Sequence, residues 1–340
     1  MRGITIPAAL CVLVSLLAGA ASASTLEEVR QRGRLLCGVD TGMTGFAVRT
    51  AAGDWEGFDV ALCRAVAAAV FADPRAVEFV PDSSSRQLAA LSEGRIDLVS
   101  RNTTWTFSRD TRLRLDFAGI YYFDRQGFIL RKEMGVTSAS ELGGTRVCVV
   151  AGSTDALNLE DFFMTGGVEA ELVEVADHDA AQEKYLAGEC NVYSTDTSRL
   201  AATRATFSDP GAHMILSDFI SKEPLGPVVR QTDPEWTDIV RWTLNTLIAA
   251  EELGVTSANV TEMSKGPTGN PEINRMLGTE GDFGAMLGLS PDWAVQVILA
   301  VGNYGEIFER NIGEKTPVGL ARGLNALWTQ GGLLYAPPFR

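Results

Sequence analysis

The segment YYFDRQGFILR, residues 121–131, decides the fold that this sequence predicts. It is a continuous extended run in which turn residues interrupt apolar ones, and a second such run, FISKEPLGPVVR, occupies residues 219–230. One strand–helix unit precedes the first run, and another lies between the two runs. Two extended crossings that flank one α/β unit indicate that this unit is inserted into the other. We therefore expect two lobes, a hinge of two crossing strands, and a ligand cleft between the lobes.

Apolar periodicity defines the two α/β units. The predicted strands lie at residues 35–40, 77–80 and 96–99 in the first unit and at 146–150, 170–175 and 191–194 in the second. The predicted helices lie at 58–71 and 84–93, then at 155–163 and 179–187, with later helices at 236–252 and 293–308 packed on the first lobe. Ligands of such α/β sheets, here expected to be mixed, bind beyond the carboxyl ends of the strands.

The length of the chain agrees with two domains, and its composition excludes some kinds of binding partner. A chain of 340 residues is longer than one hydrophobic core usually serves. Its 43 acidic residues outnumber the 29 basic ones, and the net charge of −14 excludes nucleic acid as a partner. No stretch after residue 25 is apolar enough to span a bilayer.

The first 23 residues have the pattern of a secretory signal. Arg2 is basic, residues 4–17 form a short apolar run, and Ala21-Ser22-Ala23 suits signal peptidase, so we expect cleavage after Ala23. Cys11 lacks a small residue directly before it, which favours release over lipid anchoring. The alternative is a buried N-terminal helix.

Four of the five cysteines remain after such cleavage, and an oxidising compartment would let them pair in three ways. Pairing Cys37 with Cys63 and Cys148 with Cys190 keeps each bridge local, and free buried thiols are the alternative. No cysteine or histidine spacing typical of a metal site is present, and the chain has only two histidines. We expect neither a metal nor a cofactor.

Residues 100–110, SRNTTWTFSRD, follow the predicted strand 96–99. Hydroxyl and amide donors together with Arg109, near the end of the string, suit the binding of a small carboxylate. A helix cap explains Thr106 or Ser108 but not the whole string.

Three blocks then carry a resemblance: GDWEGFD at 53–59, IDLVSRNTTWTFSRD at 96–110 and SKEPLGPVVR at 221–230. With GNYGEIFERN at 302–311 and ARGLNALW at 321–328, the chain resembles the periplasmic amino-acid-binding proteins of ABC importers, in particular the general L-amino-acid-binding branch. The resemblance implies a type II periplasmic binding protein. Residues 24–124 begin the first lobe, residues 125–222 form the inserted second lobe, and residues 223–340 return to the first lobe and add a C-terminal helical extension. The same resemblance implies a monomer that captures an L-amino acid by lobe closure and delivers it to a membrane ABC permease.

The resemblance also implies roles for residues that contact the ligand backbone. Arg109 and Thr104 would bind the α-carboxylate, and Asn102 and Asp196 would bind the α-ammonium. Asp196 could equally be the N-cap of the helix that begins at Thr197. Ser153 and Thr154, between a strand and a helix, would hold the carboxylate from the other side, and a structural cap without ligand is their alternative.

The subsite for the ligand side chain is assigned to Asp40, Met43 and Arg86. Met43 stands where relatives often present an aromatic ring, and a flexible thioether suits broad specificity. Arg86 corresponds to an arginine that binds acidic side chains, although a solvated helix charge is the alternative. These residues favour glutamate, aspartate and their amides as ligands, with wider acceptance.

Two other classes of protein compete with this interpretation. A secreted enzyme on the same scaffold, such as a dehydratase of prephenate-like acids, would need a general acid or base in the cleft. Asp40 and Asp196 could serve, but the remaining residues read as binding groups, so we expect no enzyme. An extracellular sensor domain would continue into a membrane-spanning helix, which we do not expect here.

Overall fold

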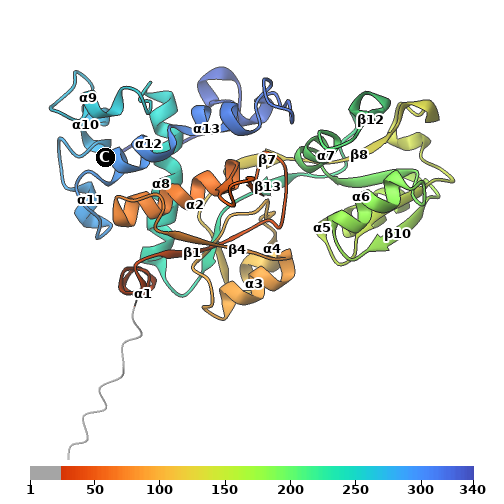
Figure 1. Cartoon of the computed structure of the whole chain (residues 1–340), viewed down its shortest axis with the longest axis horizontal. Coiled ribbons are helices and arrows are strands. Elements are labelled where there is room, and N and C mark those ends of the chain that lie inside the picture. Colours follow the sequence, from red (N-terminus) through yellow and green to blue (C-terminus); the bar gives the residue numbers. More distant parts are fainter. Residues whose placement is uncertain (1–23) are drawn as a thin grey trace, which may run out of the picture.

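The computed structural model of the chain describes residues 24–340. They form two lobes arranged along the long axis of the molecule (Figure 1). The predicted signal peptide and its cleavage point after Ala23 lie outside the described residues. Within residues 24–340, no helix has the length and apolar character needed to cross a membrane.

The first lobe is built on a five-stranded sheet in the order β4-β1-β5-β14-β6. β1 runs parallel to β4 and β5, whereas β14 runs antiparallel to β5 and β6, so the sheet is mixed as expected. The strands are β1 (Leu35–Val39), β4 (Val77–Pro81), β5 (Leu98–Val99), β6 (Leu115–Phe117) and β14 (Val228–Arg230). A separate hairpin pairs β2 (Val48–Arg49) with β3 (Trp55–Glu56), and the helices are α1 (Thr25–Arg32), α2 (Phe58–Phe71), α3 (Ser84–Ser92) and α4 (Phe107–Thr111).

The second lobe is built on a sheet in the order β10-β9-β11-β8-β12. Its strands are β8 (Gln126–Arg131), β9 (Arg146–Val150), β10 (Glu171–Val175), β11 (Val192–Asp196) and β12 (His213–Ile215). Its helices are α5 (Thr154–Gly166), α6 (His178–Leu186) and α7 (Thr197–Arg204). Short 3₁₀ helices lie at η1 (Lys132–Met134), η2 (Ala139–Glu141), η3 (Pro210–Ala212), η4 (Gly323–Asn325) and η5 (Trp328–Gln330).

Two short strands connect the lobes. β7 (Tyr122–Asp124) pairs antiparallel with β13 (Glu223–Leu225), and Asp124 stands opposite Glu223. The run predicted at 121–131 therefore divides at Arg125 into β7 and β8, and the run at 219–230 divides into β13 and β14. The second division lies at Gly226 and Pro227. A Cβ at Gly226 would lie 2.2 Å from the carbonyl oxygen of Gly119, so only glycine fits there.

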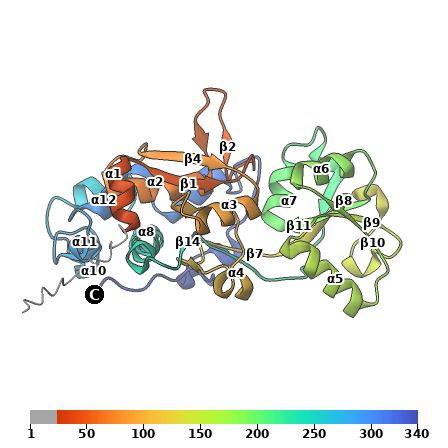
Figure 2. The same cartoon turned by 90° about the horizontal axis from the view of Figure 1, so that it is seen from below.

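The C-terminal helices share one hydrophobic core with α2 and β1 of the first lobe. They are α8 (Pro234–Glu252), α9 (Val260–Met263), α10 (Pro271–Met276), α11 (Phe283–Met286), α12 (Trp293–Val301) and α13 (Tyr304–Asn311). The helix predicted at 293–308 is in fact two helices. Gly302, with φ of 83°, ends α12, and Asn303 starts α13 with a capping box to Glu306. In both views α9, α10 and α11 lie at the end of the molecule far from the second lobe (Figure 2).

The predicted disulfides are confirmed. Cys37 of β1 is bonded to Cys63 of α2, and Cys148 of β9 is bonded to Cys190, close to the start of β11. The bridges close chain segments of 26 and 42 residues. On the chain-entropy estimate each stabilises the folded state by about 3 to 4 kcal/mol.

Candidate functional site

Polar side chains from the two lobes meet close to the β7–β13 crossing. Arg199 of α7, in the second lobe, donates from Nη2 to Oδ2 of Asp40 after β1, at 2.6 Å. Asn102, in the loop after β5, donates from Nδ2 to Oγ of Ser198 at 3.3 Å. Both bonds join one lobe to the other, so the described conformation is a closed one.

Arg109 lies in the short helix α4, and its neighbours fix its position. Its backbone N–H is capped by Oγ1 of Thr106, and its Nη1 donates to the carbonyl oxygen of Thr104 at 2.8 Å. Thr104 itself is 6% exposed and bridges to Leu225 next to the crossing. The bond to Thr104 therefore holds the guanidinium group beside the crossing.

Asn102 is held in a left-handed backbone conformation, with φ of 38°. Its N–H donates to the hydroxyl of Tyr121 at 3.1 Å, and that hydroxyl donates to the carboxylate of Asp59. Asp59 belongs to the GFD block, in which Gly57 has φ of 133° and Phe58 stacks on Tyr121 at 5.4 Å between ring centroids. The GFD block therefore supports the loop that carries Asn102, whose Oδ1 is buried without a partner.

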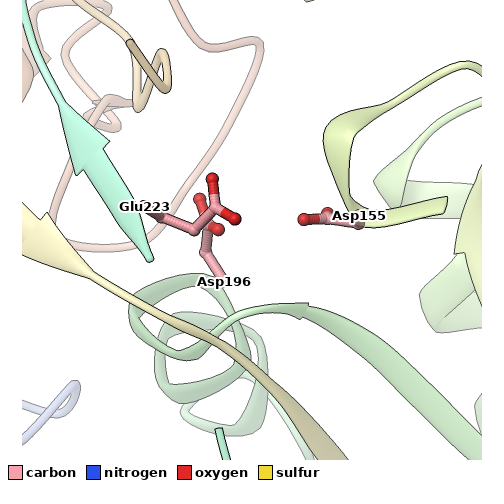
Figure 3. Close-up of side chains that lie close together, drawn as sticks. All are labelled: Asp155, Asp196 and Glu223. Carbon is pink, nitrogen blue, oxygen red and sulfur yellow. The ribbon is translucent and has the colours of Figure 1, made fainter. Parts of the chain in front are cut away.

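Three carboxylates from different elements gather on the opposite side of the site. Asp155 at the start of α5, Asp196 at the end of β11 and Glu223 of β13 each offer an oxygen, and these oxygens lie within 4.8 Å of one another. Figure 3 shows the three side chains directed toward a common point. All three residues are buried, with exposures of 6%, 9% and 2%. We call this group the acidic cluster.

The carboxylates of the acidic cluster have few hydrogen-bond donors. Asp155 accepts a bond from Oγ1 of Thr195 at 2.8 Å. Asp196 occupies the N-cap position of α7, but its side chain makes no capping bond. Glu223 accepts bonds through Oε1 from Ser221 and Asn158, and its Oε2 is buried without a partner. Buried carboxylate oxygens without donors favour a bound cation.

Burial and mutual repulsion change the acidity of the acidic cluster. Burial raises the pKa of Asp155 to about 7, with Glu223 and Asp124 adding repulsion. Burial and repulsion from Asp155 raise the pKa of Asp196 well above its ordinary value. Burial lowers the pKa of Arg109, while the attraction of the three carboxylates opposes that change. One guanidinium therefore faces three carboxylates across the site.

Asp40 has a different environment from the acidic cluster. Oδ2 accepts bonds from Arg101 and Arg199, and Oδ1 accepts the N–H of Gly42 at 3.1 Å. Burial alone would raise the pKa of Asp40, but the two guanidinium groups outweigh burial and hold it below its usual range. We call these three residues the Asp40 ion cluster. Both carboxylate oxygens of Asp40, which was predicted in the side-chain subsite, thus accept hydrogen bonds from groups of the protein.

Ser153 and Thr154 lie at the start of α5, between β9 and that helix as predicted. Oγ of Ser153 donates to the carbonyl of Val150 at 2.7 Å and accepts the N–H of Ala156 at 3.2 Å. The hydroxyl of Ser153 is therefore the N-cap of α5, and contact of Ser153 and Thr154 with a ligand carboxylate stays a prediction.

Met43 and Arg86, both predicted in the side-chain subsite, have different environments. Met43 is 2% exposed within the main hydrophobic core, and its backbone bridges to Ala47. The Arg86 side chain is 72% exposed on α3 and pairs with Asp82 four residues before it. This is the geometry of a solvated helix charge.

Sequence reasoning missed four functional positions: Asp155, Glu223, Arg101 and Arg199. Asp155 resembles an ordinary acidic residue in the first turn of a helix. Glu223 lies in the SKEPLGPVVR block, but its place opposite Asp124 is set by the register of β7 and β13, which the sequence does not show.

A cavity of about 700 Å³ lies outside this site. It opens between α2, the end of α12 and the segment after α13, and Arg64, Arg310 and Lys315 are among its lining residues. No second-lobe residue lines it, so it is not the cleft between the lobes.

The sequence matches one family of known proteins over most of its length. The model of the bacterial extracellular solute-binding proteins, family 3, matches residues 35–259. The glutamate/glutamine/aspartate/asparagine-binding protein BztA of Rhodobacter capsulatus is 54% identical over 328 residues, covering 96% of this chain and 97% of the relative. The general L-amino acid-binding periplasmic protein AapJ of Rhizobium johnstonii is 52% identical over 325 residues, covering 95% of each.

Solved structures show the same architecture. A periplasmic binding protein of an ABC transporter from Brucella ovis, with glutathione bound, superposes with a TM-score of 0.91 at 50% identity. That match covers 94% of this chain and 100% of the other. An ancestral amino-acid-binding protein, AncCDT-1, described as a precursor of cyclohexadienyl dehydratase, has a TM-score of 0.57 at 26% identity and covers 68% of this chain and 96% of the other.

Proposed function

Because the chain belongs to family 3 of the bacterial extracellular solute-binding proteins, we propose that it captures L-amino acids between its lobes for an ABC permease. The observation that carries this proposal is the charge arrangement across the site. Arg109 of the first lobe faces the acidic cluster of the second lobe and hinge. An amino-acid zwitterion placed between them meets a cation at its carboxylate and anions at its ammonium.

The groups around the two charges define how the ligand backbone lies. Arg109 binds the α-carboxylate in forked geometry, and the hydroxyl of Thr104 donates to the same group. Asp196 receives the ammonium, because its side chain makes no bond to its own helix. The unpartnered Oδ1 of Asn102 accepts a second ammonium proton. Ser153 and Thr154 support the carboxylate from the N-terminus of α5.

The proposed ligands are glutamate, aspartate, glutamine and asparagine, with wider acceptance. The name of the Rhodobacter capsulatus relative supports the acidic and amide ligands, and the name of the Rhizobium johnstonii relative supports a broad ligand specificity. Glutathione, bound in the Brucella ovis relative, adds a second candidate class, because its γ-glutamyl end carries the same carboxylate and ammonium pair. Asp40, Met43 and Arg86 remain the proposed neighbours of the ligand side chain.

A ligand that contacts both lobes stabilises the closed conformation, because the open one lacks part of these contacts. Binding groups come from both lobes, so a ligand stabilises the closed form through its differential contacts. We divide the chain at 24–124, 125–222 and 223–340, a division supported by the β7–β13 pairing. We also propose export to the periplasm after cleavage at Ala23, and a monomer without cofactor.

A thermal-shift screen tests the function. Purified protein is heated with each of the common L-amino acids, glutathione, and hydroxy and keto acid analogues, since a ligand raises the apparent stability by mass action. Glutamate and glutamine are expected to raise the melting temperature, and the analogues without an ammonium are not. No shift with any amino acid would contradict the proposal.

Arg109→Ala, followed by calorimetry, tests the site. Loss of the carboxylate's charged partner should weaken glutamate binding at least 100-fold while the circular dichroism spectrum is unchanged, an effect in the range for truncated charge pairs. Arg112→Ala, a change of an exposed arginine at the end of the same helix, is the matched control and should bind normally. Unchanged affinity in a folded Arg109→Ala protein would refute the site assignment.

A dehydratase is the second candidate. It is favoured by the likeness to the dehydratase precursor and by the raised pKa of Asp155, which suits a general acid. Incubation with prephenate should give no product, whereas steady turnover lost in Asp155→Asn would establish the enzyme.

A further inference from the structure

We propose that the acidic cluster holds a proton in the ligand-free protein and releases it when a ligand ammonium enters, so that capture is coupled to proton release. This inference rests on the proposed function, because it takes the amino acid as the entering cation. It assigns Glu223 and Asp155 to the ammonium subsite beside Asp196.

The geometry creates the need for the proton. Three carboxylate oxygens lie within 4.8 Å of one another, and all three residues are buried. Carboxylates that share a buried site cannot all remain ionised without a nearby cation, and the protons leave the group in steps that belong to the whole cluster. Arg109 is the cation that faces the cluster, and it balances one negative charge of three.

Two other charged groups act on the cluster and oppose each other. Arg199 attracts Asp155 and Asp196 but is itself paired with Asp40, and buried Asp124, which accepts bonds from Thr197, Ser198 and Arg125, repels them. Burial raises the pKa values of Tyr122 and Tyr193, which keeps both rings neutral. Burial lowers the pKa of His178, beside Asp40, and keeps that ring neutral as well.

Unused hydrogen-bonding capacity shows where a proton or an ammonium would bind. Oε2 of Glu223 is buried without a partner, and the carboxylate of Asp196 makes no capping bond although it occupies a capping position. A proton on one carboxyl would let it donate to its neighbour. A ligand ammonium brings three donors and a full positive charge, which makes that proton unnecessary.

The cluster is assembled from second-lobe elements and the hinge strand β13. Asp155 and Asp196 lie at the ends of second-lobe elements, and Asn158 of α5 donates to Oε1 of Glu223 at 2.9 Å. Asn158 also donates to Oε1 of Gln126 at 2.9 Å, which ties the hinge to the second lobe. The three carboxylates therefore stay together when the lobes separate, and the proton is present before the ligand arrives.

The expected pH dependence follows from the direction of the shifts. In the closed conformation burial raises the pKa of Asp155 to about 7, and the positive charge of an ammonium beside it would lower that pKa again. Between the two values, binding releases a proton, so affinity rises with pH. The rise approaches tenfold per pH unit below about 7 and levels off above it, as linkage requires for about one proton.

Calorimetry of glutamine binding provides the test, because the glutamine side chain does not titrate. Titrations at pH 6 and pH 8, in pairs of buffers with different ionisation enthalpies, count the protons exchanged. We expect release of up to about one proton at pH 6 and little at pH 8. Binding without proton release at pH 6, or with proton uptake, would overturn the inference while leaving the proposed function intact.

Two variants locate the proton. Glu223→Gln keeps the shape of the side chain and removes one negative charge, so it should reduce proton release at pH 6 and flatten the pH dependence. Glu160→Gln, at an exposed position of α5, is the control and should release as many protons as the unaltered protein. Undiminished proton release in a folded Glu223→Gln protein would refute the assignment, and failure of every amino acid to bind would instead refute the proposed function.

Discussion

Two buried groups of charged side chains occupy the same site, and one has an excess of positive charge whereas the other has an excess of negative charge. In the Asp40 ion cluster, two guanidinium groups meet one carboxylate whose oxygens are all engaged. In the acidic cluster, three carboxylates meet no cation within salt-bridge distance in the described chain, and one oxygen of Glu223 has no donor. Both groups use the start of α7, which carries Asp196 and Arg199. The first group holds the closed lobes together, whereas the second requires a cation from outside.

Removing the anion of the Asp40 ion cluster should have the largest effect. Asp40→Asn leaves two buried guanidinium groups without a counter-charge, which typically costs about 3 to 5 kcal/mol of folding free energy. Denaturant unfolding of the ligand-free protein measures this loss. Asp82→Asn, which breaks an exposed ion pair, is the control and should cost less than about 1 kcal/mol. If both variants were equally stable, the Asp40 ion cluster would not be a structural element.

Removing a charge from the acidic cluster should weaken binding but not folding. Asp196→Asn is expected to reduce amino-acid affinity by about 2 to 5 kcal/mol, the range for a truncated buried charge pair. Its free energy of unfolding should be unchanged or higher, because repulsion with Asp155 is relieved. Calorimetry and denaturant unfolding of one preparation measure both quantities. An equal loss for analogues that lack the ammonium would make Asp196 structural.

The free energy of unfolding should depend on pH through Asp155 of the acidic cluster. Since burial raises the pKa of Asp155 to about 7, the folded protein binds a proton there that the unfolded chain does not. Its contribution to the free energy of unfolding is present at low pH and falls as pH rises toward 7, by about 1 kcal/mol per pH unit. Asp155→Asn should remove this part of the slope between pH 5 and pH 7. Asp59, whose pKa burial raises to about 8, contributes equally to both proteins.

The smallest effect is expected at Arg86. Because its side chain is 72% exposed, Arg86→Met should change the free energy of unfolding by less than about 0.5 kcal/mol. Because Arg86 is a proposed neighbour of an acidic ligand side chain, the variant should weaken glutamate binding more than glutamine binding. Equal losses for the two ligands would reject the side-chain role that the family resemblance implies.

The sequence predicted those features that depend on local pattern. Apolar periodicity predicted three of the five strands of each sheet, and the two extended runs predicted the inserted lobe and contain β8 and β14. Neither pattern predicted β6 or β12. Cys148 and Cys190 could be paired because each lies on or beside a strand of the same unit. Arg109 was predicted from the donors in its own segment and Asp196 from the family resemblance, and both site roles stay predictions.

The remaining features depend on packing between distant segments. Arg199 lies 159 residues from Asp40, and Asn158 lies 65 residues from Glu223, so neither contact has a local signal. Met43 follows β1 as a subsite residue would, but its bridge to Ala47 turns the loop back into the core. The prediction of a single helix at 293–308 is wrong, because Gly302 with its positive φ ends α12 within an otherwise apolar run.

The placement of the two disulfides has a mechanical consequence. One bridge joins β1 to α2 in the first lobe, and the other lies wholly in the second. Each lobe is therefore cross-linked internally by a covalent bond, whereas the two lobes are joined to each other by reversible polar contacts such as Arg199 with Asp40. Separating the lobes breaks such polar contacts and leaves both disulfides intact. Release of a ligand to a permease therefore needs no redox step.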